Sequence, residues 1–147
     1  MNLKLDTNSL QGKNAFISGA TGGIGKSIAL ALADSGCNLF LTASNEERLE
    51  DVTNLFSGRD IKVSSCLGDL TSKEDVYNII GRAKKTFGNI DIVINSAGVF
   101  PNYSLFESDD EALEKTFNIN YRSAYIFIRE FAKNMVANEW GRIVNIG

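Results

Sequence analysis

The stretch Ser18-Gly19-Ala20-Thr21-Gly22-Gly23-Ile24-Gly25 decides the fold of this chain. It follows a short apolar run at residues 15–17, and apolar side chains recur at helical spacing behind it up to Ala33. A strand, a glycine-rich turn and a helix in this order favour a site for phosphate or diphosphate, because the first N–H groups of a helix are unpaired and lie at the positive end of its dipole. A tight turn without a ligand is the simpler alternative, and the rest of the sequence decides between them.

The composition is that of a globular protein, and it excludes several classes of function. With 147 residues, 44% of them hydrophobic and 22% charged, the chain is long enough to bury one core, so we expect a single domain over residues 1–147. A formal net charge of −3 predicts no surface for nucleic acid. No apolar run approaches the roughly 18 residues of a membrane-spanning helix and no signal peptide precedes the first strand, so we expect a cytoplasmic protein without membrane contact.

Two residue types bear on metals and redox chemistry. The chain has no histidine, which is the commonest zinc ligand and the commonest general base, so we expect no metal site. Cys37 and Cys66 stand apart without a C-x-x-C spacing, and we expect both to be buried, reduced thiols.

Predicted strands and helices alternate along the chain. The expected strands cover residues 14–18, 38–43, 61–67, 90–95 and 142–146. The expected helices cover residues 23–35, from a cap at Ser44 or Asn45 to about 56, from a cap at Thr71 or Ser72 to 87, and 109–137. This alternation predicts an α/β fold in which right-handed crossovers join the strands of a parallel sheet. The last helical pattern is long enough for two helices or one bent helix.

Three further polar stretches follow the expected strands or lie within the long helix. They read Gly68-Asp69-Leu70-Thr71, Asn95-Ser96-Ala97-Gly98 and Phe117-Asn118-Ile119-Asn120-Tyr121. Taken singly, each has a plain structural explanation, such as Asp69 capping a turn or an asparagine on a helix surface. Together with the G-x-x-x-G-x-G spacing of the first turn, they resemble the short-chain dehydrogenase/reductase family in order and spacing. The family has Thr in place of Ser18 and a second Asn in place of Ser96.

The resemblance implies a Rossmann-like, doubly wound parallel sheet with strand order 3-2-1-4-5, truncated after strand five, and a bound NAD or NADP. By the family's pattern, the cofactor-binding residues are Gly19, Ala20, Thr21, Gly22, Gly23, Ile24, Gly25, Ser44, Asp69, Leu70, Asn95, Ala97 and Gly98. In the family, the aspartate at Asp69 accepts a hydrogen bond from the adenine amino group. The family also carries one catalytic asparagine in the long helix, and its register favours Asn120, although the residues alone do not separate Asn120 from Asn118.

The end of the second strand bears on the choice between the two cofactors. An acidic residue there holds the ribose 2′-hydroxyl of NAD, whereas a basic one accommodates the 2′-phosphate of NADP. This chain has Ala43, Ser44 and Asn45, which are neither. Small, polar residues leave room for a phosphate, so we favour NADP over NAD.

The last residues, Gly141 to Gly147, resemble the family's fifth strand, after which the family carries its catalytic serine and then Tyr-x-x-x-Lys. Tyr125 and Arg129 have the spacing of that last pair, but an arginine is always charged and does not relay protons. We therefore expect Tyr125 to be a core or interface residue, and the 147 residues alone to show no reductase activity. We also expect residues 142–146 to form an unprotected apolar edge.

The implied function is an oxidoreductase that acts on a carbonyl or alcohol substrate, a small molecule or an acyl group. The 3-oxoacyl-acyl-carrier-protein reductases are the nearest guess, because they end strand five with a similar Ile-Gly. A non-catalytic nucleotide-binding module is the alternative. The resemblance further implies a homo-oligomer of the full-length form, packed partly through the long helix, with Phe127, Phe131 and Met135 either on that surface or in the core.

Overall fold

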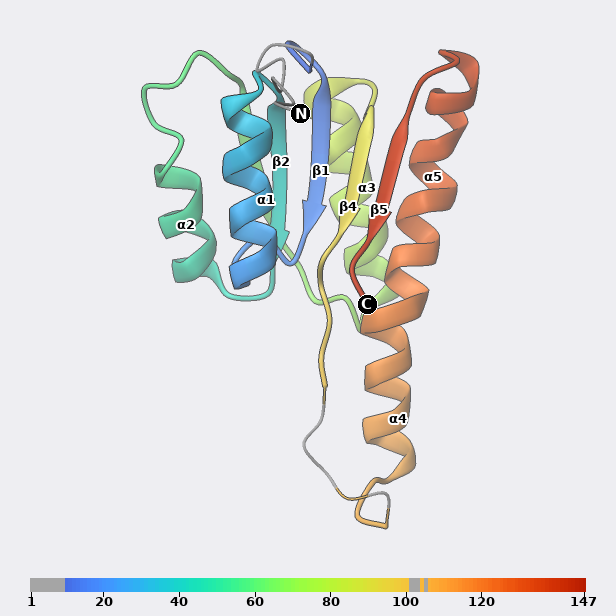
Figure 1. Ribbon diagram of the computed structural model, residues 1–147. Helices are drawn as coiled ribbons and strands as arrows, with labels where there is room; N and C mark the ends of the chain where they lie inside the picture. The colour runs from blue at the N-terminus through green and yellow to red at the C-terminus, as the bar shows by residue number, and fades with distance from the viewer. Residues whose placement is uncertain (1–9, 101–103, 105) are drawn as a thin grey trace, which may run out of the picture.

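The computed structural model describes residues 10–100, 104 and 106–147, and it shows one parallel sheet with helices on both faces (Figure 1). The strands are β1 (Asn14–Ser18), β2 (Asn38–Ala43), β3 (Val63–Leu67), β4 (Ile92–Asn95) and β5 (Arg142–Asn145). The helices are α1 (Gly23–Asp34), α2 (Glu46–Asn54), α3 (Lys73–Phe87), α4 (Asp110–Phe117), the short π-helix η1 (Asn118–Arg122) and α5 (Ser123–Ala137). Residues 1–9, which the expected single domain includes, lie outside the described part.

All neighbouring strands pair in parallel, in the order β3-β2-β1-β4-β5. The doubly wound fold and its strand order are therefore confirmed. The sheet brings the carboxyl ends of its strands to one edge, and the turns after β1, β2, β3 and β4 carry the polar stretches that the sequence singles out. β5 is the last strand on its side, and all four of its residues are exposed.

Two strands begin later than the periodicity predicts. β3 starts at Val63, where its pairing with Leu39 begins, rather than at residue 61. β4 starts at Ile92 rather than at residue 90. Just before it, the side chain of Asp91 accepts a hydrogen bond from the backbone N–H of Asn14 at 2.9 Å. The first backbone N–H of β1 is therefore bound to a side chain rather than to the backbone of β4.

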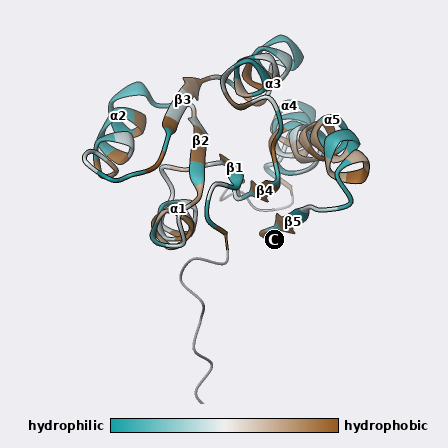
Figure 2. Ribbon diagram, turned by 90° about the horizontal axis from the view of Figure 1, so that it is seen from above, coloured by the Kyte–Doolittle hydropathy of each residue, from teal (hydrophilic) through white to brown (hydrophobic). Residues whose placement is uncertain are grey.

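Each face of the sheet carries its own hydrophobic core, because successive residues of a strand point to opposite sides. On one face, Ala15 and Ile17 pack with residues of α1 and α2. On the other face, Phe16 packs with residues of α3 and α5. The view from above shows α1 and α2 on one side of the sheet and α3 and α5 on the other (Figure 2).

An aromatic cluster fills the second core. The ring centroid of Phe16 lies 4.6 Å from that of Phe127, 5.0 Å from that of Phe131 and 6.0 Å from that of Phe40. All four rings are fully or almost fully buried, and Met135 is buried with them. Phe127, Phe131 and Met135 thus belong to the core, and the alternative that places them on an oligomer surface is wrong.

The expected long helix at residues 109–137 divides into α4, η1 and α5. The π-turn of η1 adds a residue to the turn and rotates the face that α4 presents, so that α5 packs on the sheet whereas α4 has no buried residue. Three rings on the outer side stack in succession, with centroids 5.2 Å apart for Phe117 and Tyr121 and 6.3 Å apart for Tyr121 and Tyr125. We call Phe117, Tyr121 and Tyr125 the aromatic ladder. More than half of each side chain is exposed, so Tyr125 is not a core residue.

Both cysteines are buried and free, as expected. Burial raises the pKa of the Cys37 thiol to about 11, and the neighbouring Asp91 carboxylate adds to this shift. Burial likewise raises the pKa of Cys66. Both thiols are therefore protonated at neutral pH, which suits a structural role rather than a nucleophilic one.

Candidate functional site

The glycine-rich turn is held at the carboxyl ends of three strands. Gly19 has φ of +67°, a conformation that favours glycine. A Cβ on Gly19 would lie 2.6 Å from the backbone nitrogen of Ala97, so the turn packs directly against the segment after β4. The N–H of Ala20 donates to the carbonyl of Thr42 in β2 at 3.1 Å, and the N–H of Ser96 donates to the carbonyl of Ser18 at 3.2 Å.

Helix α1 begins without a side-chain cap, which sets it apart from the helices that follow strands β2 and β3. Its N-cap is Gly22, which has no side chain to offer. By contrast, the side chain of Asn45 caps α2, that of Ser72 caps α3 and that of Asp109 caps α4. The first N–H groups of α1 are thus open to an anion at the positive end of the helix dipole.

Asp69 and Leu70 form a second wall of the site, after β3. One carboxylate oxygen of Asp69 accepts a hydrogen bond from the N–H of Thr71 at 2.8 Å, and the N–H of Asp69 donates to the carboxylate of Asp75 at 2.8 Å. These two bonds fix the turn, so Asp69 does cap a turn, which is the plain structural explanation of this residue. The second carboxylate oxygen of Asp69 takes part in neither bond.

The segment after β4 forms the third wall, and Asn95 plays a different part from its neighbours. Asn95 is buried, and its amide nitrogen donates to the side-chain oxygen of Asn145 at 2.8 Å. This bond joins the ends of β4 and β5. The side-chain oxygen of Asn95 is buried without a hydrogen-bond partner in the described part of the chain. Ser96 and Ala97 present backbone atoms to the space beside Gly19.

Asn120 is tied to the segment after β4 by two hydrogen bonds. Its side-chain oxygen accepts from the N–H of Val99, and its amide nitrogen donates to the carbonyl of Val99, both at 2.8 Å. The amide thus satisfies both backbone hydrogen-bonding groups of Val99, as a neighbouring strand would. Asn118, two residues earlier, makes no such bond and instead lines the space between α4 and the sheet.

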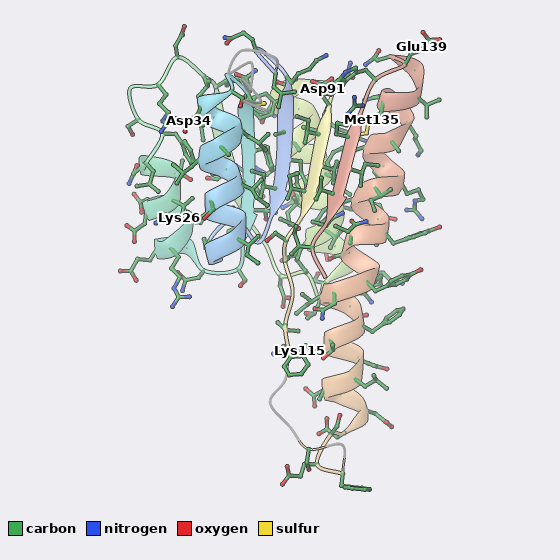
Figure 3. The ribbon with its side chains drawn as sticks, viewed as in Figure 1. Lys26, Asp34, Asp91, Lys115, Met135 and Glu139 are labelled. Carbon is green, nitrogen blue, oxygen red and sulfur yellow. The ribbon has the colours of Figure 1, made fainter. Side chains whose placement is uncertain are left out.

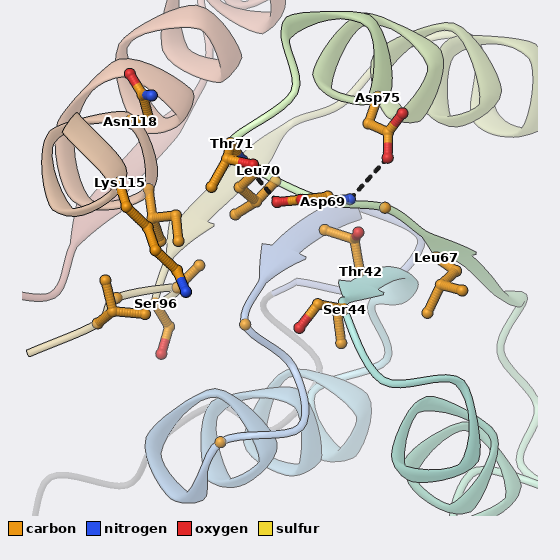
Figure 4. A pocket seen from close by; sticks show the side chains of 18 of the residues that line it. Thr42, Ser44, Leu67, Asp69, Leu70, Thr71, Asp75, Ser96, Lys115 and Asn118 are labelled. Carbon is orange, nitrogen blue, oxygen red and sulfur yellow. Dashed lines mark hydrogen bonds between the residues drawn. The ribbon is translucent and has the colours of Figure 1, made fainter. Parts of the chain in front are cut away.

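These walls enclose a cleft of about 990 Å³ at the carboxyl ends of the strands (Figure 4). Of the residues expected from the sequence, it is lined by Gly19, Gly22, Ser44, Asp69, Leu70, Ala97 and Gly98. Ala20, Thr21, Gly23, Ile24, Gly25, Asn95 and Asn120 do not line it. Gly25 supports the turn from behind, since a Cβ there would lie 2.3 Å from the carbonyl oxygen of Gly19. A crevice outside the carboxyl ends of parallel strands is where α/β proteins bind their ligands.

Sequence reasoning missed the wall that α4 contributes. Glu111, Glu114 and Lys115 line the cleft from this helix, and Thr42 of β2 and Asp75 of α3 line it from the other side. The glycine spacing and the strand ends do not predict these lining residues. The position of α4 beside the cleft depends on η1 and on the hydrogen bonds of Asn120 to Val99. Within residues 10–100, 104 and 106–147, no group of three or more acidic residues or cysteines could hold a metal ion, and no helix has the length and apolar character of a membrane span.

Comparison with known proteins gives the family. The model of the short chain dehydrogenase family matches residues 13–147. The chain belongs to the short-chain dehydrogenase family. It is 36% identical over 138 residues to an uncharacterised oxidoreductase of Staphylococcus saprophyticus, covering 93% of this chain and 59% of that protein. It is 35% identical over 137 residues to the 3-oxoacyl-[acyl-carrier-protein] reductase of Rickettsia felis, covering 93% of this chain and 54% of that protein.

Solved structures of short-chain dehydrogenases share the fold. A metagenomic short-chain oxidoreductase in complex with NADP superposes with a TM-score of 0.87 at 28% identity, over 94% of this chain and 62% of that chain. This short-chain dehydrogenase chain therefore spans between about half and two thirds of the length of the relatives named here.

Proposed function

We propose that this short-chain dehydrogenase binds NADP(H) in the cleft, and that the full-length protein transfers a hydride between NADP(H) and a carbonyl or alcohol substrate. The observation that carries the proposal is the start of α1, which has no side-chain cap and whose N-cap residue Gly22 lines a cleft of about 990 Å³. The similarity to an oxidoreductase solved with NADP supports the choice of ligand.

In this proposal, residues 19–25 hold the diphosphate, with backbone N–H groups as donors. Asp69 and Leu70 receive the adenine, Ser44 lies at the ribose that carries the 2′-phosphate, and Asn95, Ala97 and Gly98 support the ribose and nicotinamide side. Asn95 acts there through its bond to Asn145, which fixes the end of β4 beside β5. The bound cofactor supplies the hydride. The residues of this chain orient it and shield it from water.

NADP is favoured over NAD by the end of β2. Ala43, Ser44 and Asn45 place no carboxylate there to hold a free 2′-hydroxyl or to repel a 2′-phosphate. Asn45 is also engaged, because its side chain accepts the N–H of Arg48 at 2.9 Å and caps α2. Ser44 thus keeps a hydroxyl for the ligand, and it lines the cleft.

The proposed reaction also needs a proton donor beside the substrate oxygen. In the family the donor is the Tyr of Tyr-x-x-x-Lys, which acts together with a serine. Residues 1–147 include neither this serine nor this Tyr-x-x-x-Lys motif. Asn120 is the member of the catalytic set that we assign to this chain, since it fixes η1 to Val99. The alternative, a nucleotide-binding module without catalysis, predicts no in-frame Ser and Tyr-x-x-x-Lys codons after Gly147, whereas the proposal predicts both.

For the substrate we propose a carbonyl compound of the 3-oxoacyl type, on the similarity to the Rickettsia felis reductase. We place the reaction in the cytoplasm, since Cys37 and Cys66 are free thiols. We also propose a homo-oligomer formed through the aromatic ladder, because three stacked, exposed rings, one each from α4, η1 and α5, make an apolar surface. Sedimentation of Tyr121→Lys should give a smaller species than the wild type, and an unchanged species would contradict this.

Calorimetric titration of the 147-residue chain with NADPH and NADH tests the cofactor. We expect NADPH to bind with a lower Kd than NADH, and no oxidation of NADPH when a 3-oxoacyl thioester is added. We choose calorimetry rather than tryptophan fluorescence, because Trp140 packs with Lys13 and Arg142 at the opposite edge of the sheet, remote from the cleft. Binding of neither dinucleotide would refute the proposed function, and tighter binding of NADH would refute the choice of NADP.

A further inference from the structure

The cleft is lined mainly by neutral and acidic residues, and one cation faces them. Its acidic residues are Asp69, Asp75, Glu111 and Glu114. Lys115 is the only lysine or arginine among the lining residues of the described chain. An anionic ligand that enters this cleft therefore meets four carboxylates, the positive end of the α1 dipole and the single ammonium group of Lys115.

The position of Lys115 follows from the way in which α4 is held. The helix has no buried residue, so core packing does not place it. The two hydrogen bonds of Asn120 to Val99 tie η1, and with it the end of α4, to the segment after β4. Lys115 lies on the side of α4 that faces this segment (Figure 3). Its side chain points into the cavity in the direction of Ser96 (Figure 4).

Neither packing nor pairing accounts for this orientation. Lys115 is exposed, so its stem fills no core space. The ion pairs of the described residues, which involve Asp34 and Glu130, do not include it. Glu111 stands one turn before Lys115 on the same helix, at the spacing of a favourable pair, yet both side chains line the cleft without forming an ion pair.

We propose that Lys115 is a phosphate-binding residue of the cleft, which contributes to dinucleotide affinity from the side opposite the glycine turn. The inference rests on the proposed function, because it takes the ligand to be a nicotinamide dinucleotide. A lysine ammonium is a compact point charge with three donors on a flexible stem, so it can reach a phosphate from the α4 side of the cleft. In a cleft with four carboxylates, its removal leaves the ligand's negative charge without a formal counter-charge.

Two phosphates of the ligand share this chemistry. The diphosphate is common to NADH and NADPH, whereas the 2′-phosphate is present only in NADPH. If Lys115 binds the diphosphate, its loss weakens both dinucleotides by the same factor. If it binds the 2′-phosphate, its loss weakens NADPH and leaves the Kd of NADH unchanged.

Calorimetric titration of Lys115→Met with both dinucleotides tests the proposal, with Lys85→Met as the charge-matched control. Lys85 is exposed in the last turn of α3 and does not line the cleft. We expect Lys115→Met to raise the Kd of NADPH about tenfold, as for a lost charge-assisted hydrogen bond, and Lys85→Met to change it less than about twofold. Lys115→Arg, which keeps the charge, should recover most of the affinity.

The result that overturns the proposal is a Lys115→Met protein that binds NADPH as Lys85→Met does. The melting temperature of the unliganded variant should equal that of the wild type, so a loss of affinity is not a loss of fold. Failure of the wild type to bind either dinucleotide would refute the proposed function, and this inference with it. Wild-type binding with an unaffected Lys115→Met variant would refute the inference alone.

Discussion

Gly25→Ala is expected to lower the affinity for NADPH at least about 100-fold and the free energy of unfolding by about 1–3 kcal/mol. A Cβ on Gly25 would lie 2.3 Å from the carbonyl oxygen of Gly19 and 3.2 Å from the Cα of Ala20. Both neighbours are backbone of the glycine turn, so no flexible side chain can move aside. The turn itself must shift, and with it the N–H groups that receive the diphosphate. Calorimetry with NADPH and thermal unfolding measure the two effects.

Gly23→Ala is the matched control for this substitution. It adds the same methyl group two residues earlier, where nothing lies within 4 Å of the new Cβ. Because Gly23 is the first residue of α1, alanine should leave the free energy of unfolding unchanged or raise it by up to about 1 kcal/mol. A Gly25→Ala protein with wild-type affinity and stability would show that the close packing of Gly25 under the turn is not needed.

Phe16→Ala is expected to lower the free energy of unfolding by about 3–5 kcal/mol, a large part of the stability of a domain of this size. Phe16 is fully buried and contacts the rings of Phe40, Phe127 and Phe131, so the substitution empties the centre of the core between the sheet and α5. Urea unfolding followed by circular dichroism measures the loss.

The control for Phe16→Ala is Phe106→Ala. The side chain of Phe106 is 97% exposed, so its truncation should change the free energy of unfolding by less than about 0.5 kcal/mol. If the two variants unfold at the same urea concentration, the Phe16 ring is not the centre of the second core.

Local signals in the sequence suffice for the central strands and the helices that pack on them. The apolar runs of β1 and β4 and the 3.6-residue period of α3 record burial on fixed faces, and the structure places these residues in the two cores. The starts of α2 and α3 are predicted to within one residue, because a small polar residue before a run with early acidic residues marks a helix start. The structure selects Asn45 over Ser44 and Ser72 over Thr71 as the caps. The strand order 3-2-1-4-5 came from the family resemblance rather than from any single element.

The wall formed by α4 was not predictable from the sequence in this way. An apolar period at Leu113 and Phe117 indicates a helix face but does not say whether the core covers it, and here both side chains are mostly exposed. The choice between Asn118 and Asn120 as the residue bound to Val99 depends on the π-turn of η1, which changes the angle between neighbouring side chains. Lys115 lines the cleft because η1 holds α4 beside it, and the charge of Lys115 alone does not predict this position.

The proposed function requires a dinucleotide that lies across the carboxyl edge of the sheet, with its diphosphate over residues 19–25. The most direct measurement is the shift of backbone amide NMR signals when NADPH is added to the 147-residue chain. We predict the largest shifts at Gly19, Gly22 and Gly23, with further shifts at Asp69, Leu70, Ala97 and Gly98. Shifts confined to the opposite edge, around Lys13, Trp140 and Arg142, or no shifts at saturating NADPH, would contradict it.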